Sequence, residues 1–290
     1  VMMTRPPSLV SASWLSSRID RSSLKLIDAS WYLPAAGRSG YDEFLSRRLP
    51  RAQFFDIDAS DAASPLPHML PSAASFARRM TALGVGAADH VVCYDGHGIF
   101  SSARLWWMLR AHGHAAASVL DGGIGAWQAL GLPLETGDPP PPQPAAEPFV
   151  ATLDPAAVCA LDEVTAAIGQ ATIVDARSRA RFEGRVAEAR AGCRSGHIPR
   201  SVNLPFDELL DPSTRTMLPP PRLAEAFAAA GVDASGSAPL IATCGSGVTA
   251  AVLLLALHQL GREGRLYDGS WAEWGARDDL PIATGPADQS

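Results

Sequence analysis

Two short apolar segments of this chain match: residues 26–29 read Leu-Ile-Asp-Ala, and residues 173–176 read Ile-Val-Asp-Ala, 147 positions later. The same spacing relates residues 84–86 to 231–233, and residues 121–123 to 268–270. Three matches at one spacing indicate an internal duplication, so we expect two domains of the same fold.

Each half of the chain repeats one order of strand and helix patterns. An apolar strand ends in Asp-Ala, a second strand runs through a glycine-containing loop into a long apolar helix, and a third strand ends in Asp-Gly. The predicted strands are 27–29, 90–94 and 117–120, then 173–176, 239–243 and 265–267; the predicted helices are 101–111 and 248–260. Strands that alternate with helices at this spacing predict an α/β fold, in which each domain is a parallel sheet with helices on both faces.

A proline-rich segment separates the halves. Residues 134–148 read LETGDPPPPQPAAEP, a composition that excludes a helix and favours an extended linker. We expect a first domain at residues 1–138, a linker at 139–149 and a second domain at 150–290.

The charge and hydropathy of the chain limit its partners. Asp and Glu total 30 against 24 Lys and Arg, and this acidic balance argues against nucleic acid or an anionic membrane as a partner. The longest apolar run, residues 250–257, is too short to span a bilayer, and the N-terminal residues lack the apolar core of a signal peptide. We therefore expect a cytoplasmic protein.

The cysteines have neither CxxC nor CxxxC spacing, which argues against a disulfide scaffold and against a zinc site. They are Cys93, Cys159, Cys193 and Cys244. Cys93 lies in an apolar strand pattern and Cys159 in a helix-like stretch, so we expect both in the core. Cys193 lies in a glycine-containing loop. For this thiol, the alternative to a place in the core is an exposed position with a redox role. His112 and His114 lack a third ligand, so we predict no metal and no cofactor.

Cys244 stands out because it lies in a glycine-rich loop between a predicted strand and a predicted helix. Gly245 and Gly247 permit a tight turn whose N–H groups point toward the sulfur. Together with the helix N-terminus near Val248, these groups would stabilise a thiolate. Asp95 stands at the corresponding position of the first half, and a carboxylate cannot replace a sulfur nucleophile. We therefore predict a catalytic second domain and a non-catalytic first domain.

A thiolate in such a loop suits several chemistries. A phosphotyrosine-type phosphatase needs an arginine where this chain has Ala250. A P-loop needs a lysine, and the chain has no lysine after Lys25. A cysteine peptidase needs a histidine base; His197 and His258 are candidates, but their spacing selects neither.

Residues 244–250, Cys-Gly-Ser-Gly-Val-Thr-Ala, resemble the active-site loop of the 3-mercaptopyruvate sulfurtransferases, a family of the tandem-domain rhodanese superfamily. The resemblance covers nearly the whole chain. It includes residues 68–71, 102–108 and 120–123 of the first half, and residues 175–177, 181–182, 196–199 and 267–274 of the second. Arg200 departs from the family, which often has glycine after His-Ile-Pro, and residues 49–52 are a degraded form of the same motif.

The resemblance implies transfer of sulfur in two steps. Cys244 attacks the sulfur of a donor and becomes a persulfide, and an acceptor then removes the outer sulfur. The acceptor is a small thiol, a thioredoxin-like protein or cyanide. Residues of the loop that would contact the substrate or the persulfide are Gly245, Gly247, Val248 and Thr249.

The charge of the loop distinguishes the possible donors. Thiosulfate is a dianion, and enzymes that use it carry basic residues after the cysteine. Here the loop holds Gly245, Ser246 and Gly247, which suits 3-mercaptopyruvate, whose carboxylate is remote from the sulfur. A thiosulfate sulfurtransferase is the alternative within this class, and a non-enzymatic persulfide carrier is the alternative outside it.

The resemblance also assigns residues that bind the donor. Arg181 and Arg190 match two arginines that bind the substrate, and the planar guanidinium suits an α-keto carboxylate. The alternative is that the arginines of residues 177–185 are merely solvated.

A Ser–His–Asp relay, also implied by the resemblance, would comprise Ser246, His68 and Asp58. The spacing between Asp58 and His68 is one residue shorter than in the family. Asp61 is therefore the alternative to Asp58.

Overall fold

The computed structural model describes residues 6–59 and 64–287, which form two five-stranded sheets. Of the described residues, 6–59, 70–154 and 212–217 make up the first unit, and 64–69, 155–211 and 218–287 make up the second. The proline-rich linker predicts a single boundary between the two domains. The structure differs in that each unit takes up one short segment from the other half of the chain.

The sheet of the first unit is parallel throughout, with strand order β1-β5-β4-β2-β3. Its strands are β1 (Leu9–Val10), β2 (Leu24–Asp28), β3 (Gln53–Phe54), β4 (His90–Tyr94) and β5 (Ala117–Leu120). Its helices are α1 (Ala12–Ser16), α2 (Gly40–Ser46), α3 (Ala73–Ala82), α4 (Ser101–Ala111) and α5 (Gly123–Ala129), with a 3-10 turn at Pro34–Ala36.

The sheet of the second unit is also parallel, with strand order β6-β10-β9-β7-β8. Its strands are β6 (Val158–Cys159), β7 (Thr172–Asp175), β8 (Val202–Asn203), β9 (Leu240–Thr243) and β10 (Arg265–Tyr267). Its helices are α6 (Leu161–Ala167), α7 (Arg179–Phe182), α8 (Pro220–Ala229), α9 (Ala250–Gln259) and α10 (Ser270–Trp274), with 3-10 turns at Pro155–Ala157 and Phe206–Leu209. The two strand orders correspond strand by strand, and the predicted fold class is confirmed.

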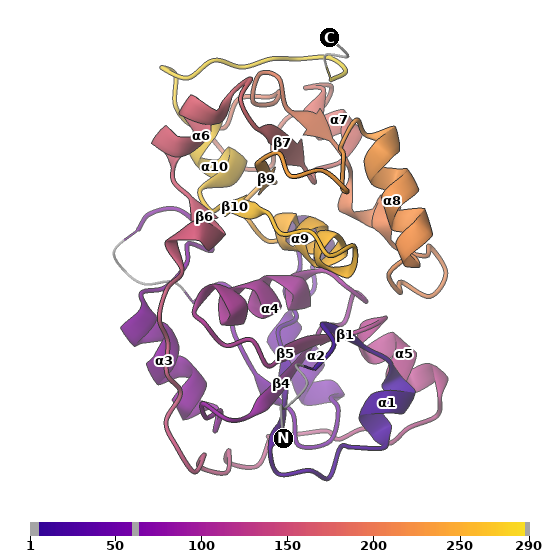
Figure 1. Cartoon of the computed structure of the whole chain (residues 1–290). Coiled ribbons are helices and arrows are strands. Elements are labelled where there is room, and N and C mark those ends of the chain that lie inside the picture. The colour runs from indigo at the N-terminus through magenta and orange to yellow at the C-terminus, as the bar shows by residue number, and fades with distance from the viewer. Residues whose placement is uncertain (1–5, 60–63, 288–290) are drawn as a thin grey trace. The chain divides into compact units, whose positions relative to one another are not determined.

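Both faces of the sheet in the first unit are covered, as the alternation of side chains along β4 illustrates. Val92 and Tyr94 belong to a core cluster that includes Leu15 of α1 and Phe44 of α2. Because successive side chains of a strand point to opposite faces, Cys93 lies on the other face, where it is fully buried. Helix α4 packs on strands β4 and β5 (Figure 1). Every residue of α4 except Arg110 is buried.

Two details differ from the sequence prediction. The expectation of a helix-like stretch around Cys159 is wrong, because this residue pairs with Tyr267 of β10 in the edge strand β6. Helix α9 begins at Ala250 rather than at residue 248, because residues 244–249 form the loop that carries Cys244.

The proline-rich segment contains no helix or strand and packs along the first unit. The Gln53 side chain donates a hydrogen bond to the carbonyl of Pro140 (3.0 Å), and the Phe149 N–H donates to Thr81 Oγ1 (3.2 Å). Phe149 is buried against Phe76, so the segment is anchored at both ends of the proline run. In the part of the chain that the structure describes, no helix is long and apolar enough to cross a membrane.

Candidate active site

The backbone of the Cys244 loop is fixed by the start of helix α10. The carbonyl of Cys244 accepts the Trp271 N–H (2.9 Å), and the carbonyl of Gly245 accepts the Ala272 N–H (2.8 Å). The Cys244 N–H donates to the hydroxyl of Ser270 (3.3 Å). The loop follows the carboxyl end of β9, the edge at which parallel α/β sheets bind their ligands.

The sulfur of Cys244 accepts a hydrogen bond from the backbone of its own loop. The Gly247 N–H lies 3.1 Å from Cys244 Sγ, and the cysteine is buried. Gly247 has a φ of 81°, a conformation that favours glycine and turns its N–H toward the sulfur. The arrangement therefore places a backbone dipole where it stabilises negative charge on sulfur.

The equivalent loop of the first unit surrounds the carboxylate of its own Asp95. Asp95 Oδ1 accepts the N–H groups of His97 (2.8 Å) and Gly98 (3.0 Å). Asp95 Oδ2 accepts those of Phe100 (2.9 Å) and Ser102 (2.8 Å). Asp95 is buried, so these four donors supply its solvation. This type of loop can hold an anion with backbone groups alone.

Ser246 and His68 are brought together. Ser246 Oγ lies 2.8 Å from His68 Nδ1, and both residues are buried. His68 has a φ of 57°, an uncommon conformation for a residue other than glycine. Although it precedes the linker in sequence, His68 packs with the second unit.

Asp58 belongs to the first unit, where it lines a cavity of about 580 Å³ and its N–H donates to Asp56 Oδ1 (2.9 Å). Its pairing with His68 stays a prediction. Asp61, the alternative to Asp58, lies outside the described residues.

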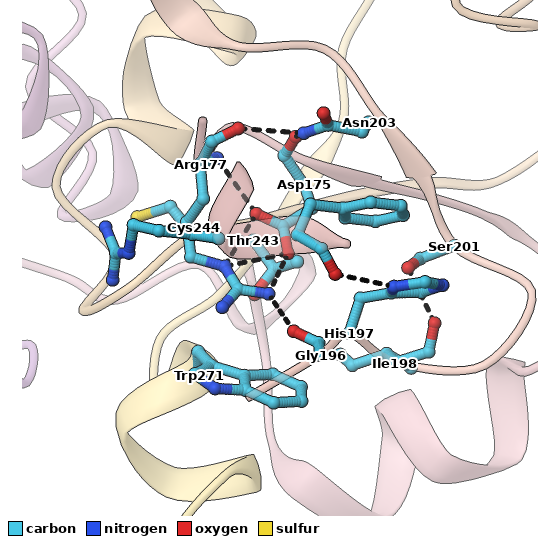
Figure 2. Close-up of polar contacts among 12 residues, drawn as sticks. Asp175, Arg177, Gly196, His197, Ile198, Ser201, Asn203, Thr243, Cys244 and Trp271 are labelled. Atoms are coloured by element: carbon cyan, nitrogen blue, oxygen red, sulfur yellow. Dashed lines mark hydrogen bonds and ion pairs between the residues drawn. The ribbon is translucent and has the colours of Figure 1, made fainter. Parts of the chain in front are cut away.

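Arg177 is the centre of a buried ionic network next to the loop (Figure 2). Its Nη2 contacts Asp175 Oδ2 (2.8 Å) and the carbonyl of Gly196 (2.7 Å), and its guanidinium lies 4.4 Å from the centre of the Trp271 ring. Although burial opposes its charge, the nearby carboxylates of Asp175 and Glu188 raise the pKa of Arg177. Arg177 is 2% exposed, so the interpretation of this arginine as merely solvated is wrong.

Glu188 joins this network to Arg181. Glu188 Oε1 contacts Arg177 Nη1 (2.8 Å) and Arg181 Nε (3.2 Å), and Glu188 Oε2 contacts Arg181 Nη2 (2.5 Å). The guanidinium of Arg181 adjoins the Cys244 loop, since a Cβ placed on Gly245 would lie 3.0 Å from its Nη2. Sequence reasoning missed Glu188, and the signal available was an acidic residue between the two candidate arginines.

Arg190 and Cys193 lie in one turn of the loop that follows Glu188. The Arg190 carbonyl accepts the Cys193 N–H (3.2 Å), and the Arg190 side chain is exposed. Cys193 is partly buried rather than exposed, with its sulfur 3.9 Å from the carbonyl of Trp271. Burial raises the pKa of Cys193 while the charge of Arg190 opposes the shift, so this thiol is a weaker nucleophile than a free cysteine.

The histidines that a cysteine peptidase would need have other partners. The His197 ring stacks on Phe182 (centroids 3.7 Å apart), and its Nδ1 lies 2.8 Å from the Phe182 carbonyl. His258 lies in the last turn of α9, whereas Cys244 precedes the first turn. The Nδ1 of His258 contacts Glu263 (2.7 Å). Among residues 6–59 and 64–287, no group of three His, Cys, Asp or Glu could hold a metal ion.

Comparison with known proteins agrees with the duplicated architecture. The rhodanese-like domain model matches the chain twice, at residues 11–130 and 160–277. The chain is 46% identical over 277 residues to 3-mercaptopyruvate sulfurtransferase of Rattus norvegicus, covering 92% of this chain and 91% of the relative. It is 42% identical over 296 residues to thiosulfate/3-mercaptopyruvate sulfurtransferase 1, mitochondrial, of Arabidopsis thaliana, covering 94% of this chain and 77% of that one. The crystal structure of SseA from Escherichia coli, from work on 3-mercaptopyruvate sulfotransferases, matches with a TM-score of 0.81 at 40% identity, over 92% of this chain and 99% of that chain.

Proposed function

Because this chain belongs to the rhodanese family and carries the family's domain twice, we propose that it moves the sulfur of 3-mercaptopyruvate to an acceptor through a persulfide on Cys244. The observation that carries the proposal is the position of Cys244 Sγ, in a loop of backbone donors with the Arg181 guanidinium beside Gly245. The second domain, residues 150–290, is catalytic. The first, residues 1–138, is not, because Asp95 stands at the cysteine position.

In the first step, the Cys244 thiolate attacks the sulfur of 3-mercaptopyruvate. The new S–S bond forms as the C–S bond breaks, and the electron pair of the C–S bond stays on carbon as the enolate of pyruvate. The proton of the donor's thiol group completes the methyl group, so that the products are pyruvate and a Cys244 persulfide anion.

The loop would stabilise the persulfide as the first unit stabilises Asp95. Each carboxylate oxygen of Asp95 is two bonds from Cβ, the same separation as the outer sulfur of a cysteine persulfide. Asp95 receives four backbone N–H groups in that position. The N–H groups of Gly247, Val248 and Thr249, which line the Cys244 loop, are the candidates for the same role.

Donor binding is assigned to charged and polar groups around the loop. Arg181 and Arg190 bind the carboxylate of the donor. Ser246, oriented by His68 at 2.8 Å, donates to the keto oxygen on which the enolate charge develops. Asp58 is the proposed partner that holds His68 in the correct tautomer.

In the second step, an acceptor thiolate attacks the outer sulfur and regenerates Cys244. A small thiol, a thioredoxin-like protein and cyanide are the proposed acceptors. The proposed location of the protein is the cytoplasm. Thiosulfate is the second candidate donor, because the Arabidopsis relative is named for both donors. The absence of basic side chains at Gly245, Ser246 and Gly247 argues for 3-mercaptopyruvate.

Steady-state assays with both donors test this function. We expect pyruvate release from 3-mercaptopyruvate in the presence of a thiol, with a higher kcat/KM than for thiosulfate. A persulfide on Cys244 without catalytic turnover would instead identify a carrier. A higher kcat/KM for thiosulfate would overturn the choice of donor.

A further inference from the structure

The carboxylate of Glu188 has an unusual position for an acidic group in a site that binds anions. Its side chain is 3% exposed, and it contacts two arginines at once, Arg177 and Arg181. A carboxylate close to an anion-binding site repels the anion and so weakens its binding. Glu188 therefore calls for an explanation beyond ion pairing.

The geometry indicates how Glu188 fixes Arg181. Both oxygens of Glu188 face the Arg181 guanidinium, which receives contacts at Nε (3.2 Å) and Nη2 (2.5 Å). This is a two-pronged contact that sets the plane of the guanidinium, and Glu188 is itself held by Arg177 Nη1 at 2.8 Å. Arg181 is 29% exposed, so without this contact its long side chain would have solvent in which to move.

The charges around the loop balance in a way that suits one class of donor. Asp175 and Glu188 carry two negative charges and Arg177 and Arg181 two positive charges, so the network is neutral. Arg190, which is close enough to Cys193 to affect its pKa, forms no ion pair with any residue that the structure describes. Without Cys244, these four side chains and Arg190 have a net charge of about +1, which is one positive charge for the carboxylate of a monoanion.

We propose that Glu188 is a positioning residue that selects the donor: it orients Arg181 against Gly245 and cancels its excess charge, so that the site prefers a monoanionic α-keto acid to a dianion. This inference rests on the proposed function, because it takes Arg181 as the group that binds the donor. The Arg181 guanidinium then acts through its directed N–H groups rather than through an uncompensated charge.

The test separates charge from geometry with two substitutions. Glu188→Gln keeps the size of the side chain and removes its charge. We expect the ratio of kcat/KM for thiosulfate to kcat/KM for 3-mercaptopyruvate to rise about fivefold at low ionic strength, because one more positive charge attracts a dianion more strongly. The increase should shrink as salt is added, since the site is partly exposed to solvent.

Glu188→Asp keeps the charge and shortens the reach. We expect KM to rise for 3-mercaptopyruvate and for thiosulfate alike, so that the donor ratio stays near the wild-type value, because Arg181 loses its orientation but not its counter-charge. The matched control is Glu183→Gln, which removes the same charge from a carboxylate that pairs with the exposed Arg185. This control should change neither quantity.

The outcomes distinguish this inference from the proposed function. If the wild type releases no pyruvate from 3-mercaptopyruvate, the proposed function fails. If the wild type is active and folded Glu188→Gln leaves the donor ratio unchanged, the selection by charge is wrong while the function stands. Should Glu188→Gln fail to fold in thermal unfolding, the decision passes to Glu188→Asp, for which an unchanged KM would refute the positioning role.

Discussion

Replacement of Arg181 by alanine tests how the donor is bound. The Arg181 side chain is 29% exposed and already shares its charge with Glu188, so we place its contact with the donor carboxylate near the middle of the range for charged hydrogen bonds, about 2 kcal/mol. That energy corresponds to a fall of roughly 30-fold in kcat/KM for 3-mercaptopyruvate. Most of the loss should appear in KM, because the carboxylate is bound in the ground state and in the transition state alike.

The fold should survive this substitution, because Glu188 retains its contact with Arg177. Arg181→Lys is the matched variant: it restores the charge without the planar guanidinium, so we expect only partial recovery.

Single-turnover kinetics divide the effect between the two steps. Formation of the Cys244 persulfide from 3-mercaptopyruvate should slow in Arg181→Ala, whereas transfer from a preformed persulfide to a neutral thiol should hardly change. An equal loss in both steps would refute the reasoning, since it would mean that Arg181 maintains the shape of the loop instead of binding the donor.

Three further predictions concern groups outside the donor contact. Asp95→Ala should lower the free energy of unfolding by at least about 3 kcal/mol in urea denaturation, because three buried N–H groups and the partly buried N–H of His97 lose their acceptor; an unchanged midpoint would contradict this. Burial raises the pKa of Asp28 from 3.8 to about 7, so the unfolded chain loses this proton at a lower pH than the folded chain, and the free energy of unfolding should fall as the pH rises from about 4 to about 7. Asp28→Asn should flatten that part of the plot of unfolding free energy against pH, and a variant whose plot keeps its slope would contradict this prediction. Cys193→Ser should keep most of the activity, measured as kcat/KM with 3-mercaptopyruvate, whereas a loss of tenfold or more in a folded variant would assign that thiol a catalytic task.

The sequence predicted the central elements of each unit closely. Strand β4, helix α4 and strand β5 have the bounds that their apolar patterns indicated, and so does β10. Most residues of these elements are buried, so their patterns are largely apolar and end at polar residues or glycine. Helix propensity misled at Cys159, since a two-residue edge strand surrounded by alanine carries almost no pattern of its own.

Features that depend on tertiary packing were beyond the sequence. The grouping of residues 64–69 with the second unit and of residues 212–217 with the first has no periodic signal in the sequence, because both segments are short and contain no helix or strand. The contact between His68 and Ser246 was expected only from a family resemblance. Glu188 was missed, because it lies in a loop whose composition resembles that of any solvated charged segment.

The most direct test of the account is mass spectrometry of the protein after treatment with 3-mercaptopyruvate in the absence of an acceptor. We predict that the peptide containing Cys244 gains the mass of one sulfur atom, that an acceptor thiol removes it, and that Cys244→Ser neither gains sulfur nor releases pyruvate. Sulfur on Cys193 in place of Cys244, or pyruvate release by a folded Cys244→Ser variant, would contradict the account.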